Sequence, residues 1–180
     1  PQERPEPADE VPAVPRAHRT YPATRRPGGP GLVTARKAAA LRARHLTPVI
    51  SRGDATEHPA PVLADLAADT EIDVVRADIS RPGDVERLVR HLRSGSRPLG
   101  GILHAAGSYD KKLISELTWE SIDAQLAAKA YGGWLLHAAT EDSFPELEFF
   151  VTYSSIASVL GGATQGRYAA ASAGLDALAE

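Results

Sequence analysis

The sequence predicts an α/β fold built on a doubly wound parallel sheet, and three observations support this prediction. Apolar, strand-like runs alternate with helix-like segments through most of the chain. Several of these runs are continuously apolar, which is typical of a sheet covered by helices on both faces. The 180 residues are 43% hydrophobic and 24% charged, an ordinary balance for a globular protein with a sizeable core.

The first eighteen residues differ from the rest and predict a linker. Eight of the 14 prolines fall within the first 30 residues, and such a stiff, extended segment cannot build a core. We therefore expect a proline-rich interdomain linker at residues 1–18 and one domain at residues 19–180. The chain begins with Pro1, contains no methionine and ends within a helical pattern, so we expect a piece of a larger protein.

The predicted helices lie between the strands along the whole domain. They are expected at residues 31–45, 60–69, 80–94, 118–141 and 167–180. The first is rich in Ala and Leu, with Arg and Lys spread through it. In the third, Ser80 is predicted to be the cap and Pro82 falls in the first turn.

The strands that follow the first helix are short and mostly apolar. They are expected at residues 46–51, 71–78, 100–107 and 147–155. Pro48 weakens the earliest of these, because a proline cannot donate to a strand ladder. The 100–107 run, GGILHAAG, leads into a turn of small residues, and the 147–155 strand is predicted to be buried.

Composition and charge exclude several classes of function. The net charge of −3 gives no general case for nucleic-acid binding. The absence of cysteine excludes disulfides and thiolate metal sites, and we predict no metal site. No apolar run is long enough to span a bilayer and no signal peptide opens the chain, so a cytoplasmic location is expected.

The turn before the first predicted helix is a candidate phosphate site. Ligands of doubly wound sheets bind at the carboxyl ends of the strands, and glycines there let backbone amides approach a pyrophosphate. This turn contains Gly28, Gly29 and Gly31. The signal is weak alone, because loops rich in Gly and Pro are usually turns and nothing more.

Three further strand ends carry candidate cofactor contacts. Ser51 and Arg52 end the second strand, where an arginine can hold the 2′-phosphate of NADP; the alternative is a solvated surface charge. Asp78 ends the third, where it can receive an adenine amino group or cap a helix. The fourth ends in HAAG, whose small residues leave room for a cofactor or allow close packing. Its candidate cofactor contacts are His104, Ala105, Ala106 and Gly107.

The last strand and last helix predict a catalytic group. Ser155 ends the strand, and Tyr168 opens the helix, with Ser172 on the same helix face four residues later. A tyrosine hydroxyl titrates near ~10 and needs a nearby cation for acid–base work at neutral pH. Lys129, within a small and apolar stretch of the long helix, is the candidate for that cation. The alternative is a lysine that extends to solvent beside a core tyrosine.

Several of these stretches together resemble the ketoreductase domain of modular polyketide synthases, in the short-chain dehydrogenase/reductase superfamily. The similarity covers roughly residues 19–180 and rests on HAAG, AAKAYGGWLLHAAT and VTYSSIASVLGGATQGRYAAASAGLDALA. It implies a Rossmann-like fold that is C-terminally incomplete here, because the family's sheet continues past residue 180. It also implies NADPH as cofactor and a β-ketoacyl chain on an acyl carrier protein as substrate. By resemblance, Ser155 orients the ketone, Tyr168 donates the proton and Lys129 supports Tyr168 and the nicotinamide ribose.

The first turn departs from the family pattern Thr-Gly-Gly-x-Gly-Gly-x-Gly. The pattern begins at Thr24, which is predicted to contact the cofactor. Arg25 and Arg26 replace its first two glycines, whereas Gly28, Gly29 and Gly31 are retained. Both variable positions are proline. Pro22 lies in the expected first strand, where its missing ladder hydrogen bond is costly away from an edge. These changes keep a second hypothesis open, a reduction-incompetent domain retained for scaffolding or for contact with the carrier protein.

Three other positions bear on mechanism and stereochemistry. Ser172 stands where the family has an Asn that assists a proton relay. Asp110 is the one match to the Leu-Asp-Asp motif of one ketoreductase subtype, and Leu160 replaces the Trp of the other, which favours the first subtype. Trp134 and His137 are predicted to be packing residues. A free-standing reductase of small ketones or alcohols is a third hypothesis, which the linker disfavours.

Overall fold

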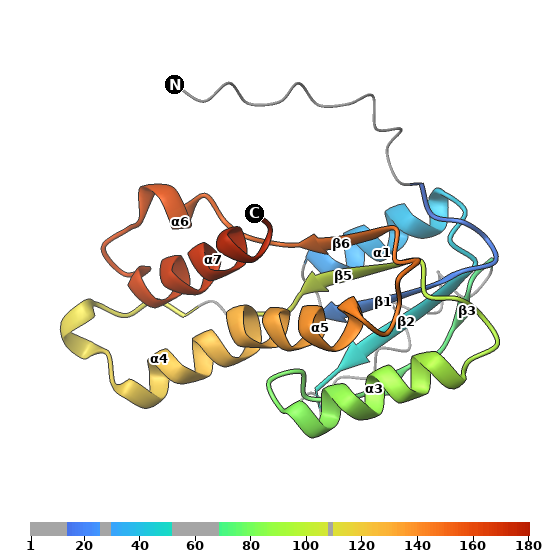
Figure 1. Ribbon diagram of the computed structural model, residues 1–180. Helices are drawn as coiled ribbons and strands as arrows, with labels where there is room; N and C mark the ends of the chain where they lie inside the picture. Colours follow the sequence, from blue (N-terminus) through green and yellow to red (C-terminus); the bar gives the residue numbers. More distant parts are fainter. Residues whose placement is uncertain (1–13, 26–29, 52–68, 108–109) are drawn as a thin grey trace, which may run out of the picture.

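The strands of the computed structural model form one parallel sheet (Figure 1). The structure describes residues 14–25, 30–51, 69–107 and 110–180. The six strands follow the order β3-β2-β1-β5-β6, and β4 also pairs with β2. Their bounds are β1 Thr20–Arg25, β2 His45–Ile50, β3 Glu71–Ile72, β4 Val75–Arg76, β5 Gly101–Ala105 and β6 Phe149–Thr152. The predicted α/β fold with a parallel sheet is therefore confirmed.

The strand order creates a switch point at β1. The chain runs from β1 outward through β2 to β3 and β4, and then crosses back to place β5 on the other side of β1. In sheets of this kind, the crevice outside the carboxyl ends of the strands at the switch point is where ligands bind. The candidate catalytic and cofactor residues are all expected near that edge.

Helices cover both faces of the sheet (Figure 1). Their bounds are α1 Pro30–Ala40, α3 Pro82–Ser94, α4 Trp119–Leu126, α5 Gly132–Glu141, α6 Ala157–Leu160 and α7 Gly166–Leu178, with a 3₁₀ turn η2 at Ile114–Glu116. One apolar cluster joins α1 to the sheet through Tyr21, Ala38 and Leu46. A larger one joins α3 and α5 to the opposite face through Leu88, Ile102 and Leu136. The site therefore rests on a two-sided core.

Each of two strand prolines interrupts one ladder of the sheet. Alternate residues of β2 direct their backbone hydrogen bonds toward β3 and β4. The carbonyls of Leu46 and Ile50 accept there from the N–H groups of Asp73 and Ala77, and Pro48 is the alternate residue between them. Pro48 has no N–H to donate there, and the predicted single strand at 71–78 is divided into β3 and β4. That part of the prediction was wrong.

Pro22 has the corresponding effect on β1. The N–H of Thr20 donates to the carbonyl of Pro98, and its carbonyl accepts from the N–H of Gly100. Pro22 is the next residue of β1 whose backbone faces this side. The pairing partner of Thr20 is Leu99, whereas that of Ala23 is Leu103, so the register changes by one residue across Pro22. The ladder between β1 and β2 continues through the same residues without a break. The central strand therefore tolerates a proline because only one of its two ladders is affected.

The first predicted helix is shorter than expected. It ends at Ala40 and not at residue 45, because Arg42 adopts a left-handed conformation with φ 74°. The N–H of Ala43 donates to Ala38 and that of Arg42 to Ala39, which closes the helix in a Schellman-type turn. The predicted helix at 60–69 lies outside the described residues, apart from Asp69.

Two other local predictions were wrong. The N-cap of α3 is Arg81, and the hydroxyl of Ser80 instead donates to Asp78, although Pro82 does open the helix as predicted. The strand predicted to be buried, β6, is half-exposed, and Val151 is 39% exposed. Among the described residues β6 is an edge strand, so no further strand shields it.

The long helix predicted at 118–141 is present but contains a π-helical turn. Thr118 caps α4 by accepting from the N–H of Ser121, and α5 ends at Glu141. Between α4 and α5, the turn η3 spans Ala127–Tyr131, and the N–H of Gly132 donates to the carbonyl of Ala127 five residues earlier. Such π turns inside helices occur often at functional sites, and this one contains Lys129.

The boundary predicted at residues 18 and 19 stays a prediction. Arg16, on the linker side, donates its backbone N–H to the hydroxyl of Tyr21 and pairs with Glu148 at 3.0 Å. Arg19, on the domain side, also pairs with Glu148, at 3.3 Å.

In the part of the chain that the structure describes, no helix is both long enough and apolar enough to cross a membrane.

Replacement of Gly100 by alanine is expected to destabilise the fold. An alanine Cβ there would lie 2.5 Å from Cε1 of Tyr21, whose side chain is fully buried and cannot move aside. Such overpacking costs about 1–3 kcal/mol in the free energy of unfolding, which chemical denaturation measures. Gly83→Ala, in the first turn of α3 with nothing within 4 Å of the new Cβ, is the matched control and should be neutral or slightly stabilising. Equal stability of the two variants would contradict this account of the packing.

Candidate active site

The structure brings Lys129 and Tyr168 together. Lys129 is buried, with 2% of its surface exposed, and its Nζ lies 4.3 Å from the centre of the Tyr168 ring. This distance is within the range of a cation–π interaction. The alternative of a lysine extending to solvent is therefore excluded. Tyr168 is half-buried in the first turn of α7, which begins two residues before it, at Gly166.

Ser155 follows β6 by three residues and is half-buried. Its Oγ accepts a hydrogen bond of 3.2 Å from the N–H of Ala157, the first residue of α6. The hydroxyl of Ser158 donates to the Ser155 carbonyl at 2.8 Å, so the serine sits in a fixed turn. Because Ala157 uses only one lone pair of the hydroxyl oxygen, the Ser155 O–H is still able to donate to a carbonyl oxygen.

Ser172 is fully buried one turn after Tyr168. Its Oγ has no hydrogen-bond partner among the described residues, although its backbone carbonyl accepts from the Ser154 hydroxyl at 3.1 Å. On the same helix, the nearby hydroxyls of Ser154 and Ser158 hold the pKa of Asp176 below its usual value. The end of β6 is therefore joined to α7 by several polar contacts.

Arg167, directly before Tyr168, is a buried positioning residue that the sequence reasoning missed. Its guanidinium pairs with Asp110 at 2.5 Å and donates to the carbonyl of Ser121 at 3.2 Å. It thus ties the segment after β5 and the start of α4 to the first turn of α7. An arginine beside a candidate catalytic tyrosine was the available sequence signal. Asp110, singled out for stereochemistry, is the partner that the structure gives it.

Trp134 and His137, both predicted to be packing residues, differ in how deeply they are buried. Trp134 is 50% exposed and stacks on Tyr131 at a ring separation of 5.7 Å, so it packs on the surface and not in the core. His137 is half-buried and meets the ring of Phe150 edge-on. Leu160, at the end of α6, is exposed.

The candidate cofactor residues lie at one edge of the sheet where the structure describes them. Gly31 is buried in the first turn of α1, Ser51 is half-buried after β2, and Ala105, Ala106 and Gly107 are half-buried at the end of β5. The carboxylate of Asp78 accepts from Ser80 and pairs with Arg81. Gly28, Gly29 and Arg52 lie outside the described residues, as do Arg26 and Pro27.

This edge fits a dinucleotide in its chemistry. Helix α1 has no acidic residue in its first turn, and a helix N-terminus of this length favours a phosphate group. Pro30 is the first residue of that helix, a position where the missing N–H costs no intrahelical hydrogen bond. The side chains at the end of β5 are small, so they leave space for a ligand at this edge of the sheet. Ser172 adds a buried hydroxyl without a described partner. The residues present therefore fit such a group.

His104 is turned into the protein. It is fully buried at 0% exposure, with Nδ1 2.8 Å from the Thr24 hydroxyl and Nε2 2.8 Å from the Lys129 carbonyl. Because a carbonyl only accepts, Nε2 carries the hydrogen and Nδ1 accepts from Thr24. Burial lowers the pKa of His104 to about 4, so the ring is neutral near pH 7. The side chains of Thr24 and His104 were both predicted to bind cofactor, and in the structure they form a hydrogen bond with each other.

A pH dependence of stability follows from His104. Its pKa is 6.5 as a free side chain and about 4 in the fold, so the unfolded chain binds the proton more tightly. The stability is therefore fully present above pH 6.5 and is lost as the pH falls toward 4, by about 3 kcal/mol for this shift. Denaturation of wild type and His104→Gln across this pH range measures the difference. A wild-type protein that loses no more stability than the variant would contradict the prediction.

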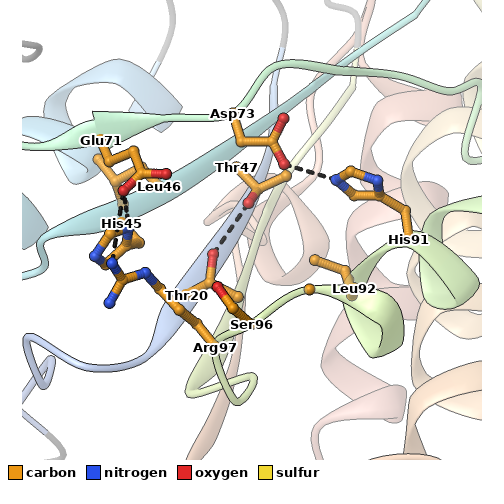
Figure 2. Close-up of a pocket in the computed structure, with 11 residues that line it drawn as sticks. Thr20, His45, Leu46, Thr47, Glu71, Asp73, His91, Leu92, Ser96 and Arg97 are labelled. Atoms are coloured by element: carbon orange, nitrogen blue, oxygen red, sulfur yellow. Dashed lines mark hydrogen bonds and ion pairs between the residues drawn. The ribbon is translucent and has the colours of Figure 1, made fainter.

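A separate polar pocket lies at the opposite edge of the sheet (Figure 2). This cavity of about 100 Å³ is lined by the amino ends of β1, β2 and β3 and by the end of α3. His45 pairs there with Glu71 at 3.1 Å, and His91 pairs with Asp73 at 2.6 Å. Burial, followed by the charge of Arg97, lowers the pKa of His45. Since ligands of such sheets bind at the carboxyl ends, this pocket is not the candidate active site.

Comparisons with known proteins agree with this geometry. The KR domain family model matches residues 27–180, and the chain belongs to this family, the ketoreductase domains. A phenolphthiocerol synthesis polyketide synthase type I of Mycobacterium marinum is 41% identical over 154 residues, which are 84% of this chain. The resemblance to polyketide synthase ketoreductases is therefore confirmed.

Solved ketoreductase structures share the fold. A ketoreductase domain from the bacillaene assembly line superposes with a TM-score of 0.84 at 31% identity and covers 96% of this chain. The first ketoreductase of the tylosin polyketide synthase superposes with a TM-score of 0.81 at 33% identity and covers 94% of it. The chain spans 41% and 36% of those two structures, and 7% of the length of the mycobacterial relative.

Proposed function

We propose that this chain catalyses the NADPH-dependent reduction of a β-ketoacyl chain, carried on an acyl carrier protein, to the β-hydroxyacyl product. The observation that carries the proposal is the buried Lys129 ammonium above the Tyr168 ring at the carboxyl edge of the sheet. A buried lysine that forms no salt bridge among the described residues, and interacts only at longer range with Asp176, is costly to fold, so its presence at this edge favours a chemical role. The family and the solved neighbours support the same reaction class.

The chain's own residues divide the work around the ketone. Ser155 donates its hydroxyl hydrogen to the ketone oxygen and orients it. Tyr168 donates the proton that this oxygen gains as the carbonyl becomes an alcohol. Lys129 places a positive charge beside the tyrosine ring, where negative charge develops as the proton leaves. Ser172 offers a buried hydroxyl to a proton relay, with a shorter reach than the Asn of the family.

The cofactor would be held at the edge formed by the strand ends. NADPH supplies the hydride when bound. Gly28, Gly29 and Gly31, with the N-terminus of α1, would hold the pyrophosphate, and Ser51 and Arg52 the 2′-phosphate. The proposed partners are the carrier protein and the other domains of the same synthase. Nucleic acid and membrane have no part in the proposal.

A second candidate function is favoured by one observation. Arg25 is the last residue of the central strand β1, where the family pattern has a glycine that admits the pyrophosphate. A domain with this turn blocked would be a reduction-incompetent scaffold that contacts the carrier protein. The cofactor therefore has to be tested before the chemistry.

Titration of nicotinamide fluorescence with the full-length protein separates the two candidates. We expect micromolar NADPH binding, followed by reduction of a β-ketoacyl carrier protein. Absence of binding by a folded protein would overturn the reductase proposal in favour of the scaffold. An increase in affinity in Arg25→Gly/Arg26→Gly would then show that the native turn is the defect.

A further inference from the structure

The HAAG motif contacts Lys129 at both of its ends. His104 donates from Nε2 to the Lys129 carbonyl at 2.8 Å. At Gly107, where φ is +153°, a Cβ would lie only 3.5 Å from Cδ of Lys129, so the aliphatic part of the lysine passes directly over this glycine. One end of the motif therefore contacts the backbone of the lysine and the other its side chain.

The hydrogen bond from His104 reaches the helix at its least regular point. Lys129 lies in the π turn η3, where the widened backbone departs from the regular α-helical ladder. A bond from the end of β5 to this turn fixes the turn against the sheet. Gly133 permits the approach, because a Cβ there would be 3.2 Å from the His104 ring and 2.8 Å from Leu175.

The imidazole is fixed on its other side as well. Thr24 at the end of β1 donates to Nδ1 at 2.8 Å, which sets the tautomer that has its hydrogen on Nε2. The chain of contacts thus runs from the switch point of the sheet through His104 to Lys129 and on to the Tyr168 ring. Each of these residues is buried or half-buried, so water has little access to the groups that form the contacts.

We propose that His104 is a positioning residue of the reductase site, which holds the π turn so that the Lys129 ammonium stays over Tyr168. The inference rests on the proposed function. It assigns His104 to the lysine and not to the cofactor, the role that the sequence predicted for it. A neutral histidine near pH 7 suits this role, because its Nδ1 must accept from Thr24 while Nε2 donates.

The chain offers a matched pair of variants. In His104→Gln the amide nitrogen falls near the position of Nε2 and is able to donate to the Lys129 carbonyl. In His104→Asn the shorter side chain reaches only the position of Nδ1, on the Thr24 side. Thr140→Val is the control, because Thr140 is equally buried on α5 and its hydroxyl bonds only within its own helix, at 2.7 Å to Leu136. It reports the cost of losing a buried hydrogen bond away from Lys129.

The first readout does not depend on activity or cofactor. The full-length protein is treated with an amine-acylating reagent, and modification of Lys129 is followed by peptide mass spectrometry relative to the exposed Lys37. We expect modification of Lys129 to be at least about 10-fold faster in His104→Asn than in wild type, because a displaced lysine loses its burial. His104→Gln should stay nearer wild type, and Thr140→Val should match it.

The second readout is steady-state reduction by the same proteins. We expect kcat of His104→Asn to fall by about 10- to 100-fold with a much smaller change in KM, because a misplaced catalytic group affects the transition state more than substrate binding. His104→Gln should recover part of kcat. Unchanged labelling in a folded His104→Asn protein overturns the inference, as does faster labelling with a wild-type kcat.

The design keeps this inference separate from the proposed function. A wild-type protein that binds no cofactor or reduces no ketone overturns the proposed function, and the labelling result still decides whether His104 holds Lys129. Should His104→Asn not fold, Thr24→Val removes the hydroxyl that fixes the His104 ring and its tautomer and tests the same contact. Its Lys129 must then be modified faster than that of Thr140→Val, or the inference is wrong.

Discussion

Tyr168→Phe is expected to lower kcat for ketone reduction by about 10²- to 10⁴-fold, the usual contribution of a positioned general acid. The substitution removes only the hydroxyl. The ring stays in the first turn of α7, so the contact with the Lys129 ammonium at 4.3 Å is retained. Stability and NADPH affinity should therefore remain close to wild type, while the proton donor is lost.

The matched control for this prediction is Tyr131→Phe. Tyr131 is 44% exposed and stacks on Trp134 at the surface, so the same chemical change there should leave kcat unchanged. Single-turnover reduction with bound NADPH distinguishes loss of chemistry from slow product release. A Tyr168→Phe protein with wild-type turnover would show that the proton comes from another group and that the tyrosine only packs.

The alternation of strands and helices could be predicted because apolar runs and helix-forming segments are local properties of the sequence. The two strand prolines show where such reasoning ends. Pro48 and Pro22 were recognised as costly, but whether a proline breaks a strand depends on which ladder its missing N–H would join. That depends on the neighbours β3, β4 and β5, which are remote in sequence. The division of the 71–78 strand therefore had no local signal.

Helix ends were the weaker part of the prediction for a similar reason. The chain from 31 to 45 is rich in helix formers, and nothing in Arg42 announces a left-handed residue, a conformation more usual for glycine. The helix stops there because the next residues are needed at the start of β2, where His45 and Leu46 are buried. Tertiary packing overrides propensity at this point.

The candidate site was predictable as a set of residue types and not as a set of contacts. Lys129 and Tyr168 were paired on chemical grounds, and the structure brings them together. His104 was assigned by its strand-end position to the cofactor, because the sequence does not show that its ring faces Thr24 and the π turn. Arg167 was overlooked because its two partners, Asp110 and Ser121, come from distant segments.

Replacement of Lys129 by methionine should change activity and stability in opposite directions. Methionine keeps the length and burial of the side chain but removes a charge that is 2% exposed and that, within the described ranges, forms no salt bridge and interacts only at longer range with Asp176. Taking an ammonium out of water costs several kcal/mol, of which a desolvated cation–π contact returns about 2. We therefore expect the free energy of unfolding to rise by about 1–2 kcal/mol, measured by denaturant titration.

The same substitution should lower kcat by about 10²-fold or more, because no positive charge then meets the negative charge that develops on Tyr168. Lys37→Met, at an exposed position of α1, is the control and should change neither quantity. The opposite signs are the decisive feature, since a residue kept only for packing would lose stability and activity together. Lower stability with retained kcat in Lys129→Met would make the lysine structural, and the costly burial of its charge would then need a different explanation from catalysis.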